Sequence, residues 1–162
     1  MRFSHDIYRT HREHITDHGI AAPTAFAVAL QSLAAGQPPN ASLMARSSTA
    51  NETTWKAFWL TGTNLVYAEA TAAHEDWNGG DDTDDVLDAT VTGWVRPVLD
   101  IRSFEISGQK TWRDDVNRQS VGASDWVLNF PDAKVPLFSP TGSGSLGDFV
   151  LSLRQAWIRE EQ

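Results

Sequence analysis

Cysteine is absent from this chain of 162 residues, and its absence excludes a disulfide framework, a thiolate nucleophile and any metal centre held by cysteine. Long apolar runs are also missing. The longest, residues 20–35, is interrupted by polar residues and falls short of the roughly 18 apolar residues that span a bilayer. The first residues lack the apolar core of a secretory signal. We therefore expect a cytoplasmic protein without a transmembrane segment.

Positive charge is scarce. The chain has 13 lysine and arginine residues against 21 aspartate and glutamate residues, which gives a net charge of −8 and a pI near 4.9. Phosphate-rich partners require a basic surface. The composition therefore predicts that the protein does not bind nucleic acid.

Aromatic residues, by contrast, are plentiful. Seven Trp and seven Phe accompany a hydrophobic content of 41%, enough for a globular domain with a substantial core. The stretch 55–72 places Thr-Gly-Thr-Asn between two runs rich in aromatic and β-branched residues. Gly and Asn reach positive φ at low cost, so the stretch predicts a β-hairpin. Its first strand carries bulky side chains on both faces and should be covered on both sides.

Apolar spacing and capping residues indicate where helices begin and end. Gly and Pro clusters mark loops, and alternation marks further strands. These signals predict helices at residues 4–18, 23–35 and 145–160, a loop at 36–40, and strands at 42–48, 90–106, 126–130 and 135–138. Pro97 cannot donate a ladder hydrogen bond, so it marks an edge, a bend or the join of two strands.

Two stretches resemble strands of bacterial pleckstrin-homology-like (PH-like) domains. Residues 58–67, Phe-Trp-Leu-Thr-Gly-Thr-Asn-Leu-Val-Tyr, resemble a hairpin of that family in which a Thr-containing turn precedes an apolar strand. Residues 96–106, with Pro, apolar residues and Asp-Ile, resemble the strand that follows. Residues 125–130 and the helical stretch 149–157 complete the match. An acidic insertion and a helical preface depart from the family pattern.

The resemblance implies an α+β fold, a bent antiparallel sheet or partly open barrel of about seven strands, capped by a C-terminal helix. The apolar spacing before residue 40 adds two N-terminal helices to this fold. The loop at residues 36–40 marks the boundary, so we expect residues 1–40 to be a helical preface packed on the main domain. Residues 41–162 are the PH-like barrel with its C-terminal helix, and the two parts form one structural unit.

For function, the resemblance implies a non-enzymatic binding or protein-interaction module with a protein partner. The alternative is a small-ligand carrier or an enzyme that uses an aromatic-lined cavity in the curved sheet. PH domains can bind phosphoinositides through a basic first hairpin loop. The corresponding loop here, residues 47–54, has no lysine or arginine, so we do not expect lipid binding. The sequence leaves the oligomeric state open.

Three histidines share one face of the first expected helix. His11, His14 and His18 are spaced i, i+3 and i+7, and zinc or nickel accepts imidazole ligands at such spacing. No His-Glu-x-x-His pattern is present, and nothing elsewhere in the sequence completes a site. We therefore interpret them as polar residues of a helix surface. They are the candidate ligands if a metal binds.

Residues 75–85 form an acidic, Gly-containing stretch that partly imitates a calcium-binding nonapeptide. A single imperfect copy cannot form the stacked coil of those repeats, so the stretch predicts a solvated loop. A tryptophan among such residues is either a core residue or a partner contact. The candidate partner contacts are Trp77, Asp81, Asp82, Asp84 and Asp85.

No catalytic motif is present. Neither serine in residues 141–147 has the Gly-x-Ser-x-Gly spacing of a nucleophile elbow. Asp114 and Asp115 are adjacent, so on a strand they point to opposite faces. The sequence therefore predicts a protein that is not an enzyme and uses no cofactor.

Overall fold

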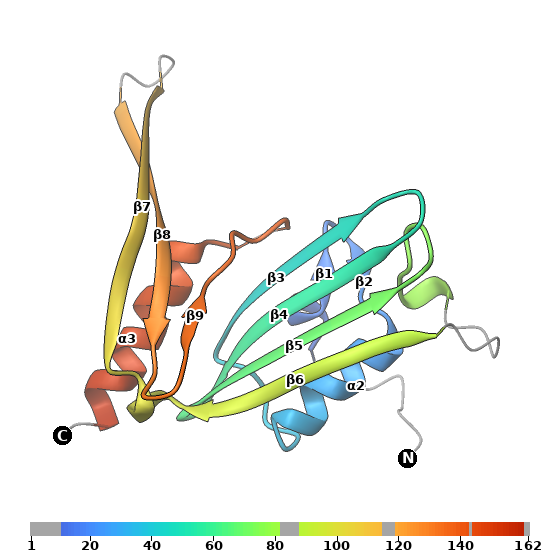
Figure 1. Cartoon of the computed structure of the whole chain (residues 1–162), viewed down its shortest axis with the longest axis horizontal. Coiled ribbons are helices and arrows are strands. Elements are labelled where there is room, and N and C mark those ends of the chain that lie inside the picture. Colours follow the sequence, from blue (N-terminus) through green and yellow to red (C-terminus); the bar gives the residue numbers. More distant parts are fainter. Residues whose placement is uncertain (1–10, 82–87, 115–118, 143, 161–162) are drawn as a thin grey trace.

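The computed structural model describes residues 11–81, 88–114, 119–142 and 144–160. In this part of the chain nine strands form three separate antiparallel sheets, and two α-helices pack against them (Figure 1). The strands are β1 (Thr16–Asp17), β2 (Ile20–Ala21), β3 (Ala41–Ser48), β4 (Thr53–Thr61), β5 (Asn64–Ala72), β6 (Ala89–Pro97), β7 (Ser103–Asp114), β8 (Gln119–Asn129) and β9 (Lys134–Pro136). The helices are α2 (Thr24–Leu33) and α3 (Leu146–Glu160), and the 3-10 turns are η1 (Arg12–His14), η2 (Gly79–Asp81) and η3 (Val98–Asp100). No helix among the described residues is both long enough and apolar enough to cross a membrane.

The predicted hairpin is confirmed and forms the centre of the largest sheet. β4 and β5 pair around a two-residue turn, with Thr61 opposite Asn64 and Gly62 at a φ of 57°. β3 pairs with the outer edge of β4, and β6 with that of β5, which gives the order β3-β4-β5-β6. We call this four-stranded sheet the main sheet.

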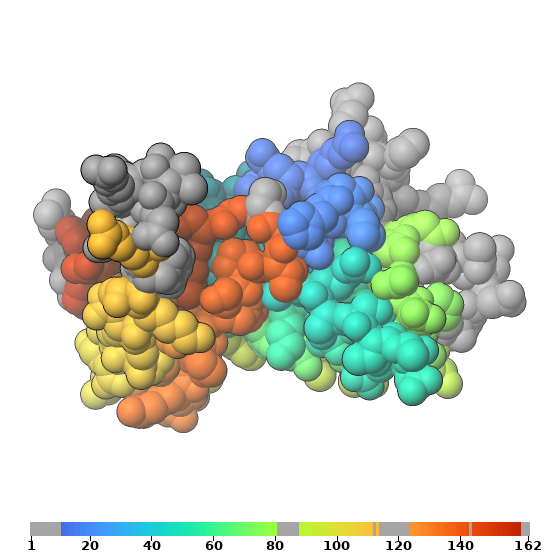
Figure 2. All heavy atoms as spheres, turned by 90° about the horizontal axis from the view of Figure 1, so that it is seen from above, coloured from blue at the N-terminus to red at the C-terminus, as the bar shows by residue number. Residues whose placement is uncertain are grey.

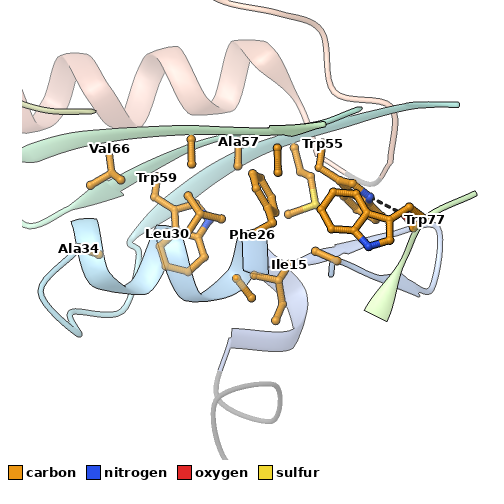
Figure 3. Close-up of a cluster of buried hydrophobic side chains, with 14 of the residues drawn as sticks. Ile15, Phe26, Leu30, Ala34, Trp55, Ala57, Trp59, Val66 and Trp77 are labelled. Carbon is orange, nitrogen blue, oxygen red and sulfur yellow. Dashed lines mark hydrogen bonds between the residues drawn. The ribbon is translucent and has the colours of Figure 1, made fainter. Parts of the chain in front are cut away.

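One face of the main sheet is covered by α2, the predicted helix at residues 23–35. Pro23 precedes its first turn, and Gly36 follows its end at a φ of 75°, a conformation that favours glycine. The helix places Phe26 and Leu30 against Trp55 and Trp59 of β4 (Figure 3). All four side chains are at most 1% exposed.

Two tryptophans of this core, Trp55 and Trp59, have partners for their polar atoms. The indole nitrogen of Trp55 donates to the backbone carbonyl of Trp77 at 2.8 Å, and that of Trp59 donates to the carbonyl of His14 at 3.2 Å. An unpaired buried donor would cost about 1–3 kcal/mol. The two bonds also attach the segments around His14 and Trp77 to the main sheet.

The opposite face of the main sheet packs against α3 and the second sheet, which has the order β7-β8-β9. Phe58 of β4 meets Phe149 of α3 there, and Leu128 and Leu153 are fully buried in the same cluster. The prediction of an amphipathic helix at residues 145–160 is confirmed. β4 is therefore buried on both faces, as its sequence predicts.

The expected fold class is wrong, because the strands do not form a single bent sheet. The structure has three separate open sheets where the resemblance implied one bent sheet or partly open barrel. Pro97 ends β6, the η3 turn follows, and β7 then pairs with β8 and not with the main sheet. Proline has no backbone N–H to continue the ladder, which explains the break at this residue.

The expected pair of N-terminal helices is wrong as well. Among the described residues, a single α-helix, α2, precedes the main sheet. Residues 12–21 form η1 and the small β1–β2 hairpin, whose turn holds His18 at a φ of 47° and Gly19 at 80°. The β-branched residues Ile15, Thr16 and Ile20 favour extended backbone. Residues 4–10 of the expected first helix lie outside the described residues.

Phe26→Ala tests the α2 core. Removing this fully buried ring should lower the free energy of unfolding by about 3–5 kcal/mol, because the lost burial and the remaining cavity both destabilise the fold. Leu151→Ala is the control, since Leu151 lies on α3 and is 55% exposed, and it should change stability by less than about 0.5 kcal/mol. Urea unfolding followed by circular dichroism measures both. Equal effects of the two substitutions would contradict the packing described here.

Candidate functional site: an aromatic groove between two sheets

Three aromatic side chains stand in register across the main sheet, on the face opposite α2. Phe58 of β4 pairs with Tyr67 of β5, and Tyr67 pairs with Trp94 of β6. The ring centroids of the first pair are 4.9 Å apart and those of the second are 5.5 Å apart. Directly opposed side chains on neighbouring strands are close enough for such contacts. The result is a continuous aromatic row across three strands.

The segment that contains β9 forms the other wall of a groove over this row. Phe138 lies 5.2 Å from Phe58, centroid to centroid. Figure 1 shows that the two larger sheets meet near η3 and diverge away from it, and the groove lies where they separate. We call it the aromatic groove. It has a volume of about 380 Å³ and is lined by Lys56, Phe58, Tyr67, Trp94, Lys134, Val135, Pro136, Leu137 and Phe138.

Charged groups stand at the edge of this groove. The Tyr67 hydroxyl donates to Glu69 Oε2 at 2.6 Å, and Lys56 Nζ lies 3.5 Å from the same oxygen. Burial raises the pKa of Tyr67, and the hydrogen bond to Glu69 and its negative charge raise it further. The phenol therefore stays protonated at neutral pH and acts as a donor, not as a base. On the facing wall, Lys134 Nζ lies 3.7 Å from Glu105 Oε2, and both side chains are exposed.

A charge pair connects the two sheets beside the groove. Arg96 of β6 donates to both carboxylate oxygens of Asp132, at 2.6 and 3.1 Å. Its guanidinium carbon lies 5.4 Å from the Trp94 ring centroid and 4.9 Å from that of Phe130, within the range of cation–π attraction. The hydrogen bond to Arg96 lowers the pKa of Asp132. The bidentate pair therefore fixes the β8–β9 turn beside Arg96, near the end of β6.

The lining residues define what the aromatic groove can do. Aromatic faces and aliphatic side chains provide area for an apolar or aromatic group, and two lysine ammonium groups can attract a carboxylate beside it. The described lining residues include no histidine, serine, aspartate or glutamate. The arrangement suits binding.

The three candidate metal ligands do not share one helix face. His11 is buried, and its ring lies 5.6 Å from that of Trp59. His14 bonds Ser42 Oγ through Nδ1 at 2.7 Å, while His18 is exposed in the β1–β2 turn. No group of three or more potential ligands in the described part of the chain is placed to hold a metal ion.

The contacts of His14 imitate a catalytic triad of nucleophile, base and acid. Its Nδ1 bonds Ser42 Oγ, and its Nε2 lies 3.3 Å from Glu13 Oε1. A catalytic relay requires an acid that holds the imidazole in one orientation. Glu13 has an 82% exposed side chain and is free to rotate in solvent. We therefore interpret the His14–Ser42 hydrogen bond as an attachment of η1 to β3.

The candidate partner contacts in the acidic stretch divide between core and surface segments. Trp77 is 3% exposed and packs in the α2 core, where a partner would not reach its indole. Asp81 ends η2. Asp82, Asp84 and Asp85 lie outside the described residues. The involvement of these aspartates with a partner stays a prediction.

A second polar cluster joins four segments that are far apart in the sequence. Arg46 Nε lies 3.4 Å from Asp17 Oδ2, and one terminal nitrogen lies 3.7 Å from Asp76 Oδ1. The Thr141 hydroxyl accepts from the Arg46 backbone N–H at 2.8 Å and donates to Asp17 Oδ1 at 3.2 Å. Figure 2 shows the orange segment after β9 between the second sheet and the blue N-terminal hairpin. The cluster holds this segment, and with it Phe138, in place.

Comparisons with known protein families, with characterised proteins and with solved structures find no match to this chain. The resemblance of residues 58–67 and 96–106 to PH-like domains therefore stays a prediction.

Sequence reasoning placed Phe58 on the face away from Trp55 and Trp59 but did not identify the groove. One signal could have revealed part of it. A two-residue turn between Thr61 and Asn64 fixes the hairpin register, which places Phe58 opposite Tyr67. The approach of Phe138 depends on contacts between sheets, for which the sequence has no comparable signal.

His14→Gln tests the effect of burial on titration. Burial lowers the pKa of His14 from 6.5 and outweighs the attraction of Glu13, so the unfolded chain binds more protons than the folded protein just below pH 6.5. The free energy of unfolding should therefore fall as the pH drops from 7 to 5. His14→Gln should flatten this slope by at most about 1.4 kcal/mol per pH unit.

Urea titrations at pH 7, 6 and 5 measure the slope. Ser42→Ala is the matched variant, because it removes the hydrogen-bond partner and keeps the imidazole, and it should retain the wild-type slope. An unchanged slope in His14→Gln would show that this residue does not contribute.

Proposed function

We propose that the protein is a non-enzymatic binding module whose aromatic groove receives a segment of a partner protein. The observation that carries the proposal is the convergence of four aromatic rings on one open groove with lysines at its edge. The rings come from β4, β5, β6 and the segment after β9, so the site exists only in the folded domain.

The composition of the groove supports a protein ligand. Trp and Tyr dominate the energy of protein interfaces because they bury large areas with few rotatable bonds. Tyr67 and Trp94 are only partly buried and stacked on each other, so they present preformed surface to a ligand. A partner side chain that is apolar or aromatic would pack on this row.

The charges at the edge indicate what should flank that side chain. Lys56 is 43% exposed and Lys134 is 72% exposed, each with a single carboxylate at 3.5–3.7 Å. Both ammonium groups can approach a further carboxylate. We therefore propose that the preferred segment combines an apolar or aromatic residue with a neighbouring acidic residue.

A small apolar ligand is the second candidate function. The volume of about 380 Å³ falls at the lower end of the roughly 300–1,000 Å³ typical of small-molecule sites. This hypothesis uses the same lining residues and the same lysines, and it differs from the first only in the size of the ligand.

Trp94→Ala tests the groove. Peptides selected on the wild-type protein from a random displayed library should carry an apolar or aromatic residue beside an acidic one. Trp94→Ala should weaken them at least tenfold, as truncation of a central aromatic contact does. Isothermal titration measures the affinities. Leu151→Ala, an exposed change on α3, is the control and should bind as the wild type does.

Lys134→Glu separates recognition from folding, because the Lys134 side chain is exposed and its loss leaves the aromatic row intact. It should weaken the acidic peptides and leave stability unchanged. Phenylacetate and indole, titrated while amide NMR spectra are recorded, test the second candidate. Binding of these probes without any selected peptide would favour the small ligand. Peptides that bind Trp94→Ala and Lys134→Glu with wild-type affinity would overturn the site.

A further inference from the structure

Among the strands that the structure describes, β6 stands at an edge of the main sheet. It is nine residues long, and β5 is its only neighbour within this part of the chain. Ladder bonds alternate along a strand, so every second residue of β6 directs its backbone N–H and C=O away from β5. Proteins usually protect such edges with lysine, proline or a bulge. β6 has no charged residue from Ala89 to Val95, and its proline stands at the last position.

Two exposed side chains on one face of this edge are apolar. Val91 is 36% exposed and Val95 is 40% exposed. Both lie on the face of β6 that carries Gly93. A Cβ at Gly93 would come within 2.6 Å of Leu33 Cδ1, which shows that this face is the one covered by α2. The two valines therefore continue the apolar sheet face under α2 as far as the edge of the sheet.

The surface around this edge carries little charge in an otherwise acidic chain. No charged residue occurs from residue 20 to residue 45, a stretch that includes all of α2, although the chain has a net charge of −8. A contact along β6 and α2 brings few like charges together in a chain whose net charge is strongly negative. This favours a second copy of the chain as the occupant of the edge.

We propose that β6 pairs antiparallel with β6 of a second copy, so that a two-fold axis extends the main sheet across both molecules. Opposed residues in an antiparallel pair project to the same face. A two-fold axis through Gly93 places Val91 of one copy opposite Val95 of the other, and these side chains then project to the same face of the joined sheet. Both α2 helices then lie on the same face of the joined sheet.

The charges at the ends of β6 complement each other in this register. Asp88, which is exposed, directly precedes the strand, and Arg96 lies near its end. In the antiparallel pair, Asp88 of each copy is the diagonal neighbour of Arg96 in the other, within reach of long side chains. Arg96 already holds Asp132 and gains a second carboxylate. A two-fold contact satisfies both ends equally.

Sedimentation equilibrium of the full chain tests the pairing. The wild type should sediment at twice the chain mass of 17.9 kDa. Val91→Lys combined with Val95→Lys should sediment as a monomer, because opposed lysines repel and cannot be buried. Leu151→Lys places the same charge on another exposed apolar residue and should remain dimeric. Circular dichroism shows whether each variant is folded.

Cysteine cross-linking tests the register, because the chain has no native cysteine. Val91→Cys with Val95→Cys places one thiol opposite another between copies and should give a disulfide-linked dimer on a non-reducing gel. Within one copy the two positions are about 13 Å apart, at about 3.3 Å per residue, which is too far for a disulfide. Val91→Cys alone is the matched control and should stay unlinked.

Three outcomes would overturn the proposal. The first is a wild type that sediments as a monomer at 100 µM and below. The second is a double lysine variant that remains a folded dimer, and the third is equal cross-linking of the single and double cysteine variants. Peptide binding at the aromatic groove is measured separately, so the failure of either proposal leaves the other standing.

Discussion

The burial of β4 on both faces is the constraint on which the rest of the structure depends. Its side chains alternate between Trp55, Ala57 and Trp59 on one face and Phe58 and Leu60 on the other, and all five are nearly inaccessible to solvent. A strand of this kind requires a layer on each side. α2 supplies one layer, and α3 with the second sheet supplies the other.

The second layer covers its face unevenly, and this creates the aromatic groove. The two larger sheets are joined through the buried Val98 and Ile101, and they diverge from that end. Phe58 on the inner strand β4 is buried, while Tyr67 and Trp94 on the next strands are only partly covered. Divergence of the two sheets thus leaves part of an aromatic row as the lining of an open groove.

Polar contacts position the parts of the molecule that hydrophobic packing leaves undefined. The Arg96–Asp132 pair is exposed at Asp132, and exposed pairs add little to stability. Its bidentate geometry nevertheless sets the angle between β6 and the β8–β9 turn. The Arg46 cluster does the same for the segment after β9. The Arg96–Asp132 pair therefore acts on the shape of the groove more than on the free energy of unfolding.

The sequence by itself determined the local elements. The turn chemistry of residues 61–64 set the central hairpin, and apolar spacing set α2 and α3, because these signals act between residues close in the chain. It gave the wrong structure near Ile15 and Thr16, where β-branched residues competed with a helical pattern. Only the tertiary structure decided that Pro97 separates two sheets, that Phe138 meets Phe58 and that β6 stands at the edge of the described main sheet. These features depend on contacts between distant segments, and their energy lies in packing that no local pattern records.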